Sequence, residues 1–330
     1  MVRIIAEVAQ GYEGKPDYCR LYVKAAAKAG ADAVKFQIVY ADDVAEPGYA
    51  YYDWYKKLEM DVSLWREVRE LAGGLGIDLL ADISGERAMK VAESIGLDGI
   101  KIHSSNFFNR SLIRRAFDLA PRVFVSLGGI EEGEIAQLVA VATEWGKRGS
   151  LALLYGFQAE PTPIERSSLS RIRLLDEKYP DLEIGYMDHA PGDSDDRVHL
   201  SLLAGALGAD WIEKHLTLSR YLEIEDWVSA LEPAEFEVYV STVRRLEAAY
   251  GEPTMALTDP EWAYREKSVK KLLAARDVRA GRAIVPADLV FKRTARIPAG
   301  RGFHDPGLVL GRTLSRSLAA GEPILAEDLQ

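Results

Sequence analysis

Residues 16–39, PDYCRLYVKAAAKAGADAVKFQIV, contain the signals that decide the fold of this 330-residue chain. Pro16 suits the first turn of a helix and Gly30 suits the position after its last turn, so a helix is predicted over 16–29. Residues 33–39 form a short apolar run of the kind that becomes a strand buried on both faces. A helix followed closely by such a strand is the unit from which parallel α/β sheets are built.

The same alternation of short apolar runs and longer amphipathic runs continues to about residue 250. Strands are predicted at 4–9, 33–39, 78–83, 99–104, 122–127, 151–156, 183–188 and 211–216. Helices are predicted at 16–29, 62–75, 86–95, 110–119, 131–145, 163–178, 197–207 and 233–249. Eight such pairs in about 250 residues predict a (β/α)8 TIM barrel. An open doubly wound sheet is the alternative, but no G-x-G-x-x-G motif follows the first strand, which disfavours it.

The composition excludes several classes of protein. Apolar residues make up 48% and charged residues 28%, which excludes a chain that is disordered, collagen-like or coiled-coil throughout. No apolar run reaches the 18 or so residues of a membrane span, and the N-terminal apolar stretch is too short for a signal peptide. The net charge of −10 disfavours a nucleic-acid partner, and the single cysteine, Cys19, excludes an internal disulfide. A cytoplasmic protein with no membrane or nucleic-acid partner is expected.

The alternation stops after about residue 250, and a second domain is predicted beyond it. Residues 251–267 are polar and contain prolines, which predicts a linker between domains at 1–250 and 268–330. The second domain contains an internal repeat, in which RDVRAGRAIVPADL at 276–289 aligns with RSLAAGEPILAEDL at 316–329. A domain of about 60 residues is near the lower limit for independent stability, so we expect it to lean on the barrel or on another subunit.

The predicted barrel strands end in polar residues that are costly to bury. Catalytic groups of α/β barrels lie at the carboxyl ends of the strands, which are otherwise apolar. The polar residues at or just after these ends are Glu7, Gln10, Lys35, Gln37, Asp82, Ser84, Lys101, His103, Ser104, Ser126, Tyr155, Gln158, Glu160, Asp188, His189, Glu213, Lys214 and His215. Charges inside strands are unfavourable unless they face a polar mouth, so an active site is predicted there.

Two pairs among these residues suggest specific chemistry. His189 and His215 end adjacent strands and could share one divalent ion, because imidazole suits zinc, manganese and iron; the alternative is a pair of structural histidines. Lys35 and Lys101 could bind a phosphate or a carboxylate as point charges. Two alternatives stay open for the lysines: salt bridges with glutamates inside the barrel, or a desolvated lysine that forms a Schiff base.

Short segments spread over the chain carry a family resemblance. They are IAEV at 5–8, AGADAVKFQ at 29–37, KLE at 57–59, KI at 101–102, PTP at 161–163, DH at 188–189, IEKHLT at 212–217 and LEP at 231–233. Together they resemble the sialic acid synthases, a family that condenses phosphoenolpyruvate with an N-acetylated hexosamine to make nonulosonic acids. The last 63 or so residues are similar to the antifreeze-like SAF domain, a small β-rich β-clip fold that is near the lower size limit for a domain. The resemblance thus implies a TIM barrel followed by a SAF domain.

The resemblance also implies roles for the matching positions. His189 and His215 would bind Mn²⁺ or Mg²⁺, which would polarise the aldehyde of an acceptor sugar. Glu7, Lys35 and Lys101 would take part in catalysis together with the two histidines. The resemblance implies that Lys35, Lys101, Ser104 and Ser126 hold phosphoenolpyruvate, and that Glu7, Gln37, Asp226 and Arg293 face the sugar or the reacting centre. From their places at or after the strand ends, the further substrate contacts predicted are Asp82, Tyr155, Gln158, Glu160 and Glu213. Arg293 would reach the barrel of a neighbouring subunit, in a domain-swapped homodimer.

Several positions of the donor and acceptor pockets depart from the family pattern. Asp82 stands where the family has a small hydroxyl residue, Met187 where it has serine, and Gln158 and Glu160 where it has asparagine and tyrosine. We therefore predict a metal-dependent synthase that joins phosphoenolpyruvate to an aldose, with remodelled pockets. The alternatives are a related carbon–carbon lyase or synthase with another donor, such as pyruvate, and a sugar-acid-binding protein without catalysis.

Overall fold

The computed structural model describes residues 2–157, 159–297 and 300–330. Eight parallel strands close into a barrel in chain order, β1 to β8. They are β1 (Arg3–Ala9), β2 (Ala33–Ile38), β3 (Asp78–Ile83), β4 (Gly99–Ile102), β5 (Val123–Ser126), β6 (Leu151–Tyr155), β7 (Glu183–Asp188) and β8 (Trp211–His215). The predicted TIM barrel is therefore confirmed, and the open doubly wound sheet is wrong.

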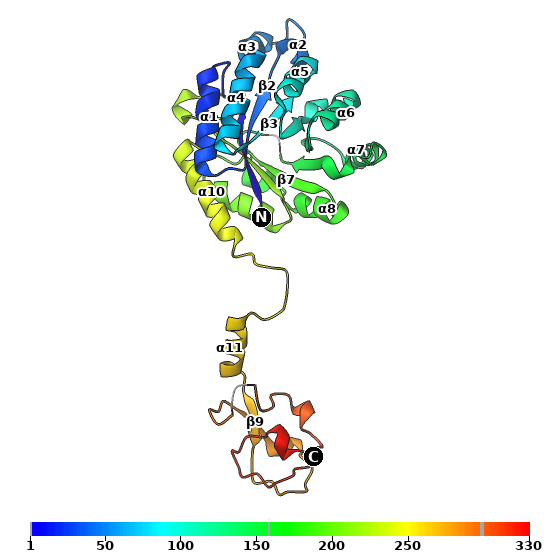
Figure 1. The fold of residues 1–330 in the computed structure, drawn as a ribbon, viewed down its shortest axis with the longest axis vertical. Coiled ribbons are helices and arrows are strands. Elements are labelled where there is room, and N and C mark those ends of the chain that lie inside the picture. Colours follow the sequence, from blue (N-terminus) through cyan, green and yellow to red (C-terminus); the bar gives the residue numbers. More distant parts are fainter. Residues whose placement is uncertain (1, 158, 298–299) are drawn as a thin grey trace. The chain divides into compact units, whose positions relative to one another are not determined.

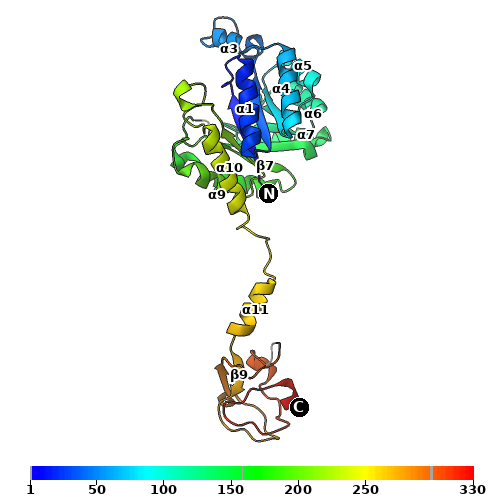
Figure 2. The same ribbon diagram turned by 60° about the vertical axis from the view of Figure 1, so that its left-hand side comes forward.

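Helices surround the barrel, as Figure 1 shows. The eight predicted ones are α1 (Pro16–Ala29), α4 (Val62–Leu75), α5 (Glu86–Ile95), α6 (Arg110–Leu119), α7 (Glu132–Glu144), α8 (Ser170–Lys178), α9 (Asp196–Ala206) and α10 (Pro233–Glu247). Two short helices that the sequence pattern did not predict, α2 (Ala41–Val44) and α3 (Tyr52–Leu58), follow β2. Figure 2 shows α1 beside α4 and α10, so the first and last helices of the ring are neighbours. None of the described helices is long and apolar enough to cross a membrane.

The interior of the barrel changes from apolar to polar along its strands. A separate apolar cluster is formed by Ile5, Ala33, Leu80, Phe124, Ala152, Leu154, Met187 and Trp211. Side chains alternate between the two faces of a strand, so the residue two positions further on points to the same side. For six of the eight cluster residues those positions hold Glu7, Lys35, Asp82, Ser126, His189 and Glu213, and only β6 continues with Leu154 and Gly156. The apolar layer thus lies below a polar layer at the carboxyl ends of the strands, where active sites of this fold lie.

The chain divides into two compact units, Met1–Gly251 and Glu252–Gln330. The second unit contains α11 (Asp259–Ser268) and the antiparallel pair β9 (Lys271–Ala274) and β10 (Leu289–Lys292). Helix α11 overlaps the stretch predicted as a linker. Its first turn is stabilised by a capping box between Thr258 and Glu261, which explains why a polar stretch with prolines still contains a helix.

The internal repeat folds into two matching halves. The Val278 N–H donates to the Leu318 carbonyl at 2.8 Å, and the Leu318 N–H donates back to the Val278 carbonyl at 2.9 Å. Asp288 and Asp328 are buried at equivalent places. Each carboxylate accepts a backbone N–H from three residues earlier and an arginine Nε–H, at 2.6–3.0 Å. The repeated aspartate therefore ties each half together, which explains why both copies contain it.

Replacing Asp288 by alanine is expected to destabilise the second unit by about 2 kcal/mol, because charge-assisted hydrogen bonds to Val285 and Arg276 are lost. Burial opposes the charged carboxylate, but these two donors hold the pKa of Asp288 below its usual value. The contribution to stability is therefore present above the unfolded pKa near 3.9 and is lost as the pH falls through the folded pKa. Hydrogen exchange over residues 283–290 in the full chain measures the effect. Exchange unchanged from wild type would contradict this account, and the exposed Glu327→Gln is the control.

Candidate active site

The register of the strands brings five charged side chains together at the mouth of the barrel. Glu7 is paired with Lys35 across β1 and β2, and Asp82 with Lys101 across β3 and β4. Glu213 lies on β8, which closes the barrel against β1. All five side chains are buried. The mouth therefore holds two ammonium groups and three carboxyl groups within one polar layer.

Glu213 bridges the two lysines. Its Oε1 accepts a hydrogen bond from the Lys101 Nζ at 2.7 Å, and its Oε2 lies 3.3 Å from the Lys35 Nζ. Lys35 also forms an ion pair with Glu7, and the Lys101 Nζ lies 3.9 Å from Asp82 Oδ2. Of the alternatives for the lysines, salt bridges with interior glutamates are thus present in the described protein, and both ammonium groups remain at the mouth.

Burial and neighbouring charges set the protonation of this network. Burial lowers the pKa of Lys35 to about 8, and the attraction of Glu213 offsets this only in part. Burial also disfavours the charged form of Lys101, but Glu213 and Asp82 raise its pKa above the usual value. Burial would raise the pKa of Glu213, but the two lysines hold it well below its usual range. Lys101 and Glu213 are therefore charged at neutral pH, and Lys35 is the lysine that loses its proton most readily.

A second cluster lies at the ends of β7 and β8. The rings of His189 and His215 have centroids 5.2 Å apart. Glu160, from the loop after β6, places its Oε1 3.5 Å from His189 Nε2 and 3.6 Å from His215 Nε2. Asp226 lies beside both groups, with Oδ2 3.5 Å from His215 Nδ1. Burial and a hydrogen bond with Asp226 raise the pKa of Glu160 to about 9. Burial lowers the pKa of both histidines, that of His215 to about 3, so both imidazoles are neutral and have a free electron pair.

Backbone contacts fix the loop that carries His189. Its carbonyl accepts hydrogen bonds from the Thr162 N–H and from the Ser229 hydroxyl, both at 2.9 Å. Further along the same loop, a Cβ placed at Gly192 would lie only 2.1 Å from the Ala230 carbonyl oxygen. Glycine therefore permits the close approach of the loops after β7 and β8 that positions His189.

We expect Gly192→Ala to destabilise the fold by about 1–3 kcal/mol, because the Ala230 backbone must move to admit the new methyl group. Displacement of the loop would also misplace His189 and lower turnover by about a hundredfold. Denaturant unfolding and steady-state rates measure the two effects. Gly133→Ala on α7 is the matched control, since nothing lies within 4 Å of its added Cβ and it should gain about 0.5–1 kcal/mol. Wild-type stability in the Gly192 variant would refute this account of the loop.

Three further predicted site residues lie at strand ends around the mouth. Ser126 is fully buried in the polar layer, and its hydroxyl donates to Met187 Sδ at 3.7 Å. Gln37 accepts from Gln10 Nε2 at 2.9 Å beside the mouth. Ser104 begins the short helical turn that follows β4. These three thus occupy strand ends as the sequence pattern predicted.

Tyr155 faces away from the mouth, and Arg293 belongs to the other compact unit. Tyr155 packs in the core between barrel and helices, where its hydroxyl donates to the Ser167 carbonyl at 3.1 Å. Arg293 belongs to the second unit, where its Nε donates to the Ser268 carbonyl at 3.3 Å. Gln158 lies outside the described residues.

Asp188 and Lys214 also face away from the mouth. They form a fully buried ion pair, with Nζ 3.3 Å from Oδ1, and Ser201 of α9 donates to the other carboxylate oxygen at 3.0 Å. Neighbouring positions on one strand face opposite sides, so Lys214 faces the helices while Glu213 and His215 face the interior. This pair stabilises the packing of α9 against the barrel and takes no part in the mouth.

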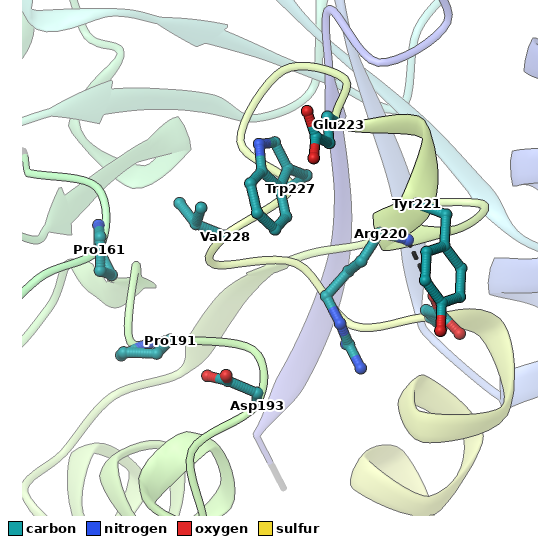
Figure 3. A pocket seen from close by; sticks show the side chains of 9 residues that line it. Pro161, Pro191, Asp193, Arg220, Tyr221, Glu223, Trp227 and Val228 are labelled. Carbon is teal, nitrogen blue, oxygen red and sulfur yellow. Dashed lines mark hydrogen bonds between the residues drawn. The ribbon is translucent and has the colours of Figure 1, made fainter.

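A cavity of about 680 Å³ is lined by the residues drawn in Figure 3, which come from the loops that carry the histidine cluster. Its lining includes Pro161, which follows Glu160, and Trp227, which follows Asp226. Arg220 is held by Glu235, with Nη2 2.7 Å from Oε1. The full lining is Pro161, Pro191, Asp193, Arg220, Tyr221, Glu223, Trp227, Val228 and Glu232. Its volume suits a small molecule, and an indole and charged groups on one wall suit a polyhydroxylated one. Sequence reasoning missed these loop residues, because they show no periodicity.

The fold and the site together define an enzyme of the TIM-barrel class, with ionisable residues gathered at the carboxyl ends of the strands. Comparison with known families then gives the group. The NeuB family matches residues 22–255, and the SAF domain matches residues 272–330. The chain therefore belongs to the NeuB family, and the predicted resemblance and the C-terminal SAF domain are confirmed.

Individual relatives resemble the chain over most of its length. An N,N'-diacetyllegionaminic acid synthase of Campylobacter jejuni is 27% identical over 88% of this chain and 90% of its own. An uncharacterised protein of Methanocaldococcus jannaschii is 28% identical over 99% of this chain and 94% of its own. Among solved structures, an N-acetylneuraminic acid synthetase from Leptospira borgpetersenii in complex with citrate matches with a TM-score of 0.73 and 27% identity, covering 81% of this chain and 92% of that one.

Proposed function

We propose that the protein condenses phosphoenolpyruvate with an aldose of the N-acetylhexosamine type, giving a nonulosonic sugar acid and inorganic phosphate. Carbon 3 of the donor bonds to the aldehyde carbon, water adds at carbon 2, and phosphate leaves from carbon 2. The observation that carries the proposal is the pair Lys35 and Lys101, buried at the mouth beside two neutral histidines in a chain of the NeuB family. The synthases among its relatives support the same chemistry.

The metal-ligating atoms of the histidine cluster suit a divalent ion. Two neutral imidazoles and the carboxylate of Glu160 have ligand atoms that all lie within 4.8 Å of one another. We propose Mn²⁺ or Mg²⁺, held by His189 and His215, as the resemblance implies. When bound, the ion supplies Lewis-acid polarisation of the acceptor aldehyde.

The residues of the chain bind and orient the two substrates in this proposal. The ammonium groups of Lys35 and Lys101 attract the carboxylate and phosphate of the donor, and Glu213 holds both of them in place. Lys35, with its pKa of about 8, is also the group at the mouth best able to exchange a proton. The further proposed contacts are Glu7, Gln37, Ser104, Ser126, Glu160 and Asp226.

Calorimetric titration of the Mn²⁺-loaded protein with phosphoenolpyruvate is the first test. Saturable binding, lost in Lys101→Met, is the expected result, followed by release of phosphate and a sugar acid when N-acetylhexosamines are added. The exposed Lys90→Met is the matched control and should bind as wild type does. A folded, metal-loaded protein that gives no heat with phosphoenolpyruvate would rule the proposed donor out.

A homodimer belongs to the same proposal. The resemblance implies that Arg293 of one subunit contacts the acceptor bound to the other. Sedimentation of the full chain tests the dimer. Mixing Arg293→Ala with His215→Ala tests the exchange, because activity above that of either variant alone requires that one chain supply what the other lacks.

A donor without a phosphate is the second candidate, and a specific observation favours it. Asp82 is buried 3.9 Å from Lys101, where it would repel a phosphate, and Met187 packs against the Ser126 hydroxyl. A 2-oxo acid such as pyruvate has no phosphate to place there and so avoids this repulsion. If this candidate is right, wild type turns over pyruvate without releasing phosphate, and Asp82→Ser gains about tenfold or more in affinity for phosphoenolpyruvate.

A further inference from the structure

We propose that Glu160 is a third protein ligand of the ion, so that the mouth holds a site of two histidines and one carboxylate. The inference deepens the proposed function, since it concerns the ion of the same site. Glu160 was predicted as a substrate contact, at a position where the family has tyrosine. The structure instead sets it against both histidines, in the loop after β6.

The distances support shared ligation. Glu160 Oε1 is nearly equidistant from the two imidazoles, 3.5 Å from His189 Nε2 and 3.6 Å from His215 Nε2. Two ligand atoms that each lie about 2.1 Å from one ion are separated by about 3–3.5 Å at the usual coordination angles. Small movements of side chains are enough to bring all three atoms to one ion.

The surroundings of the histidines aim their nitrogens into the cluster. Asp226 faces His215 Nδ1, which leaves Nε2 for the side of Glu160. A carboxylate behind a ligating histidine is the usual arrangement around protein-bound metals. His189 is nine-tenths buried, and its Nδ1 has no hydrogen-bond partner among the described residues, so its ring is not held by a purely structural network.

The loop that carries Glu160 is tied to His189 directly. The Thr162 hydroxyl donates to the carbonyls of Phe157 and Ala159, at 3.0 and 2.8 Å, and so closes the loop around Glu160. The Thr162 N–H donates to the His189 carbonyl. Glu160 is therefore positioned by the same residue that positions one of the histidines, as a ligand set requires.

The ligand set also narrows the choice of ion. Two nitrogen donors and one carboxylate suit a first-row transition ion such as Mn²⁺, Fe²⁺ or Co²⁺, with positions left open for a substrate oxygen and water. Mg²⁺ prefers oxygen ligands and retains most of its water. We therefore expect Mn²⁺ to bind in the presence of a large excess of Mg²⁺.

Titration of the full chain with Mn²⁺ by calorimetry, without donor or acceptor, tests the inference. Glu160→Gln should weaken Mn²⁺ binding at least tenfold, and Glu160→Asp should recover part of the loss. His189→Ala should abolish binding. Glu177→Gln, at an exposed carboxylate of α8, is the matched control and should leave binding unchanged. Circular dichroism establishes that each variant is folded.

Co²⁺ provides a second readout, because its visible absorption reports the number and type of its ligands. A spectrum that changes in Glu160→Gln supports direct ligation. Wild-type Mn²⁺ affinity and an unchanged Co²⁺ spectrum in Glu160→Gln would overturn the inference, as would a wild-type protein that binds neither ion. Because these titrations contain no phosphoenolpyruvate, a failure of the proposed donor leaves their result unaffected.

Discussion

His215→Ala is expected to lower turnover about a thousandfold or more, a larger loss of activity than we expect from any other single substitution in the protein. His215 is buried at the mouth between Glu160 and Asp226, and its neutral imidazole is one of two nitrogens available to an ion. In the proposed reaction, loss of that ligand removes the Lewis acid, which contributes several kcal/mol to such reactions. Steady-state rates with saturating Mn²⁺ measure the effect.

The matched control is His199→Ala. His199 lies on α9 with 71% of its side chain exposed, and we expect its substitution to leave turnover within about twofold, since exposed positions away from a site contribute little. If both histidine variants keep full activity while the protein remains folded, His215 has no role in the reaction and the proposed metal chemistry falls with it.

Lys101→Met is expected to destabilise the barrel by about 3–5 kcal/mol, the largest stability effect predicted. The ammonium group compensates Glu213, at 2.7 Å, and Asp82, at 3.9 Å, and all three side chains are buried. Without it, carboxylates remain in the interior with too little positive charge, and a broken buried ion pair costs about that much. Urea unfolding followed by tryptophan fluorescence provides the measurement.

A second substitution separates charge imbalance from lost packing. Adding Asp82→Asn to Lys101→Met removes one of the uncompensated carboxylates and should restore about 1–2 kcal/mol, because neighbouring charges couple. Lys90→Met, at an exposed site on α5, should change stability by less than about 0.5 kcal/mol. A loss below about 1 kcal/mol in Lys101→Met would mean that the mouth is far better hydrated than its burial implies.

Much of the barrel could be predicted from the sequence because each signal is local. The proline before α1, the glycine after it and the apolar run of β2 lie within one stretch of chain, and the pattern recurs eight times. The charged strand ends could be predicted for the same reason, since burying Glu7 or Lys35 in an apolar strand is unfavourable anywhere but at a mouth. Helices α2 and α3 were missed, because they are too short to show a period.

Contacts made between loops could not be predicted from local signals. Glu160 was identified as a site residue, but nothing in the sequence gives its distance from two histidines on other strands. The wall formed by Arg220 and Trp227 depends on how the loop after β8 folds back. Tyr155 was predicted as a site residue because it ends a strand. Neighbouring positions on a strand face opposite sides, and the Tyr155 side chain faces the helices, where its hydroxyl donates to Ser167.

The reciprocal hydrogen bonds between Val278 and Leu318 have an evolutionary consequence. Each half of the repeat has its own turn glycine and its own buried aspartate. The two halves therefore contain the same structural elements and pair with each other symmetrically. Tandem duplication of a segment coding for one half of the second unit leaves this kind of internal symmetry. The two copies nevertheless differ in sequence, as in the residue after the turn glycine, which is Arg282 in one copy and Glu322 in the other.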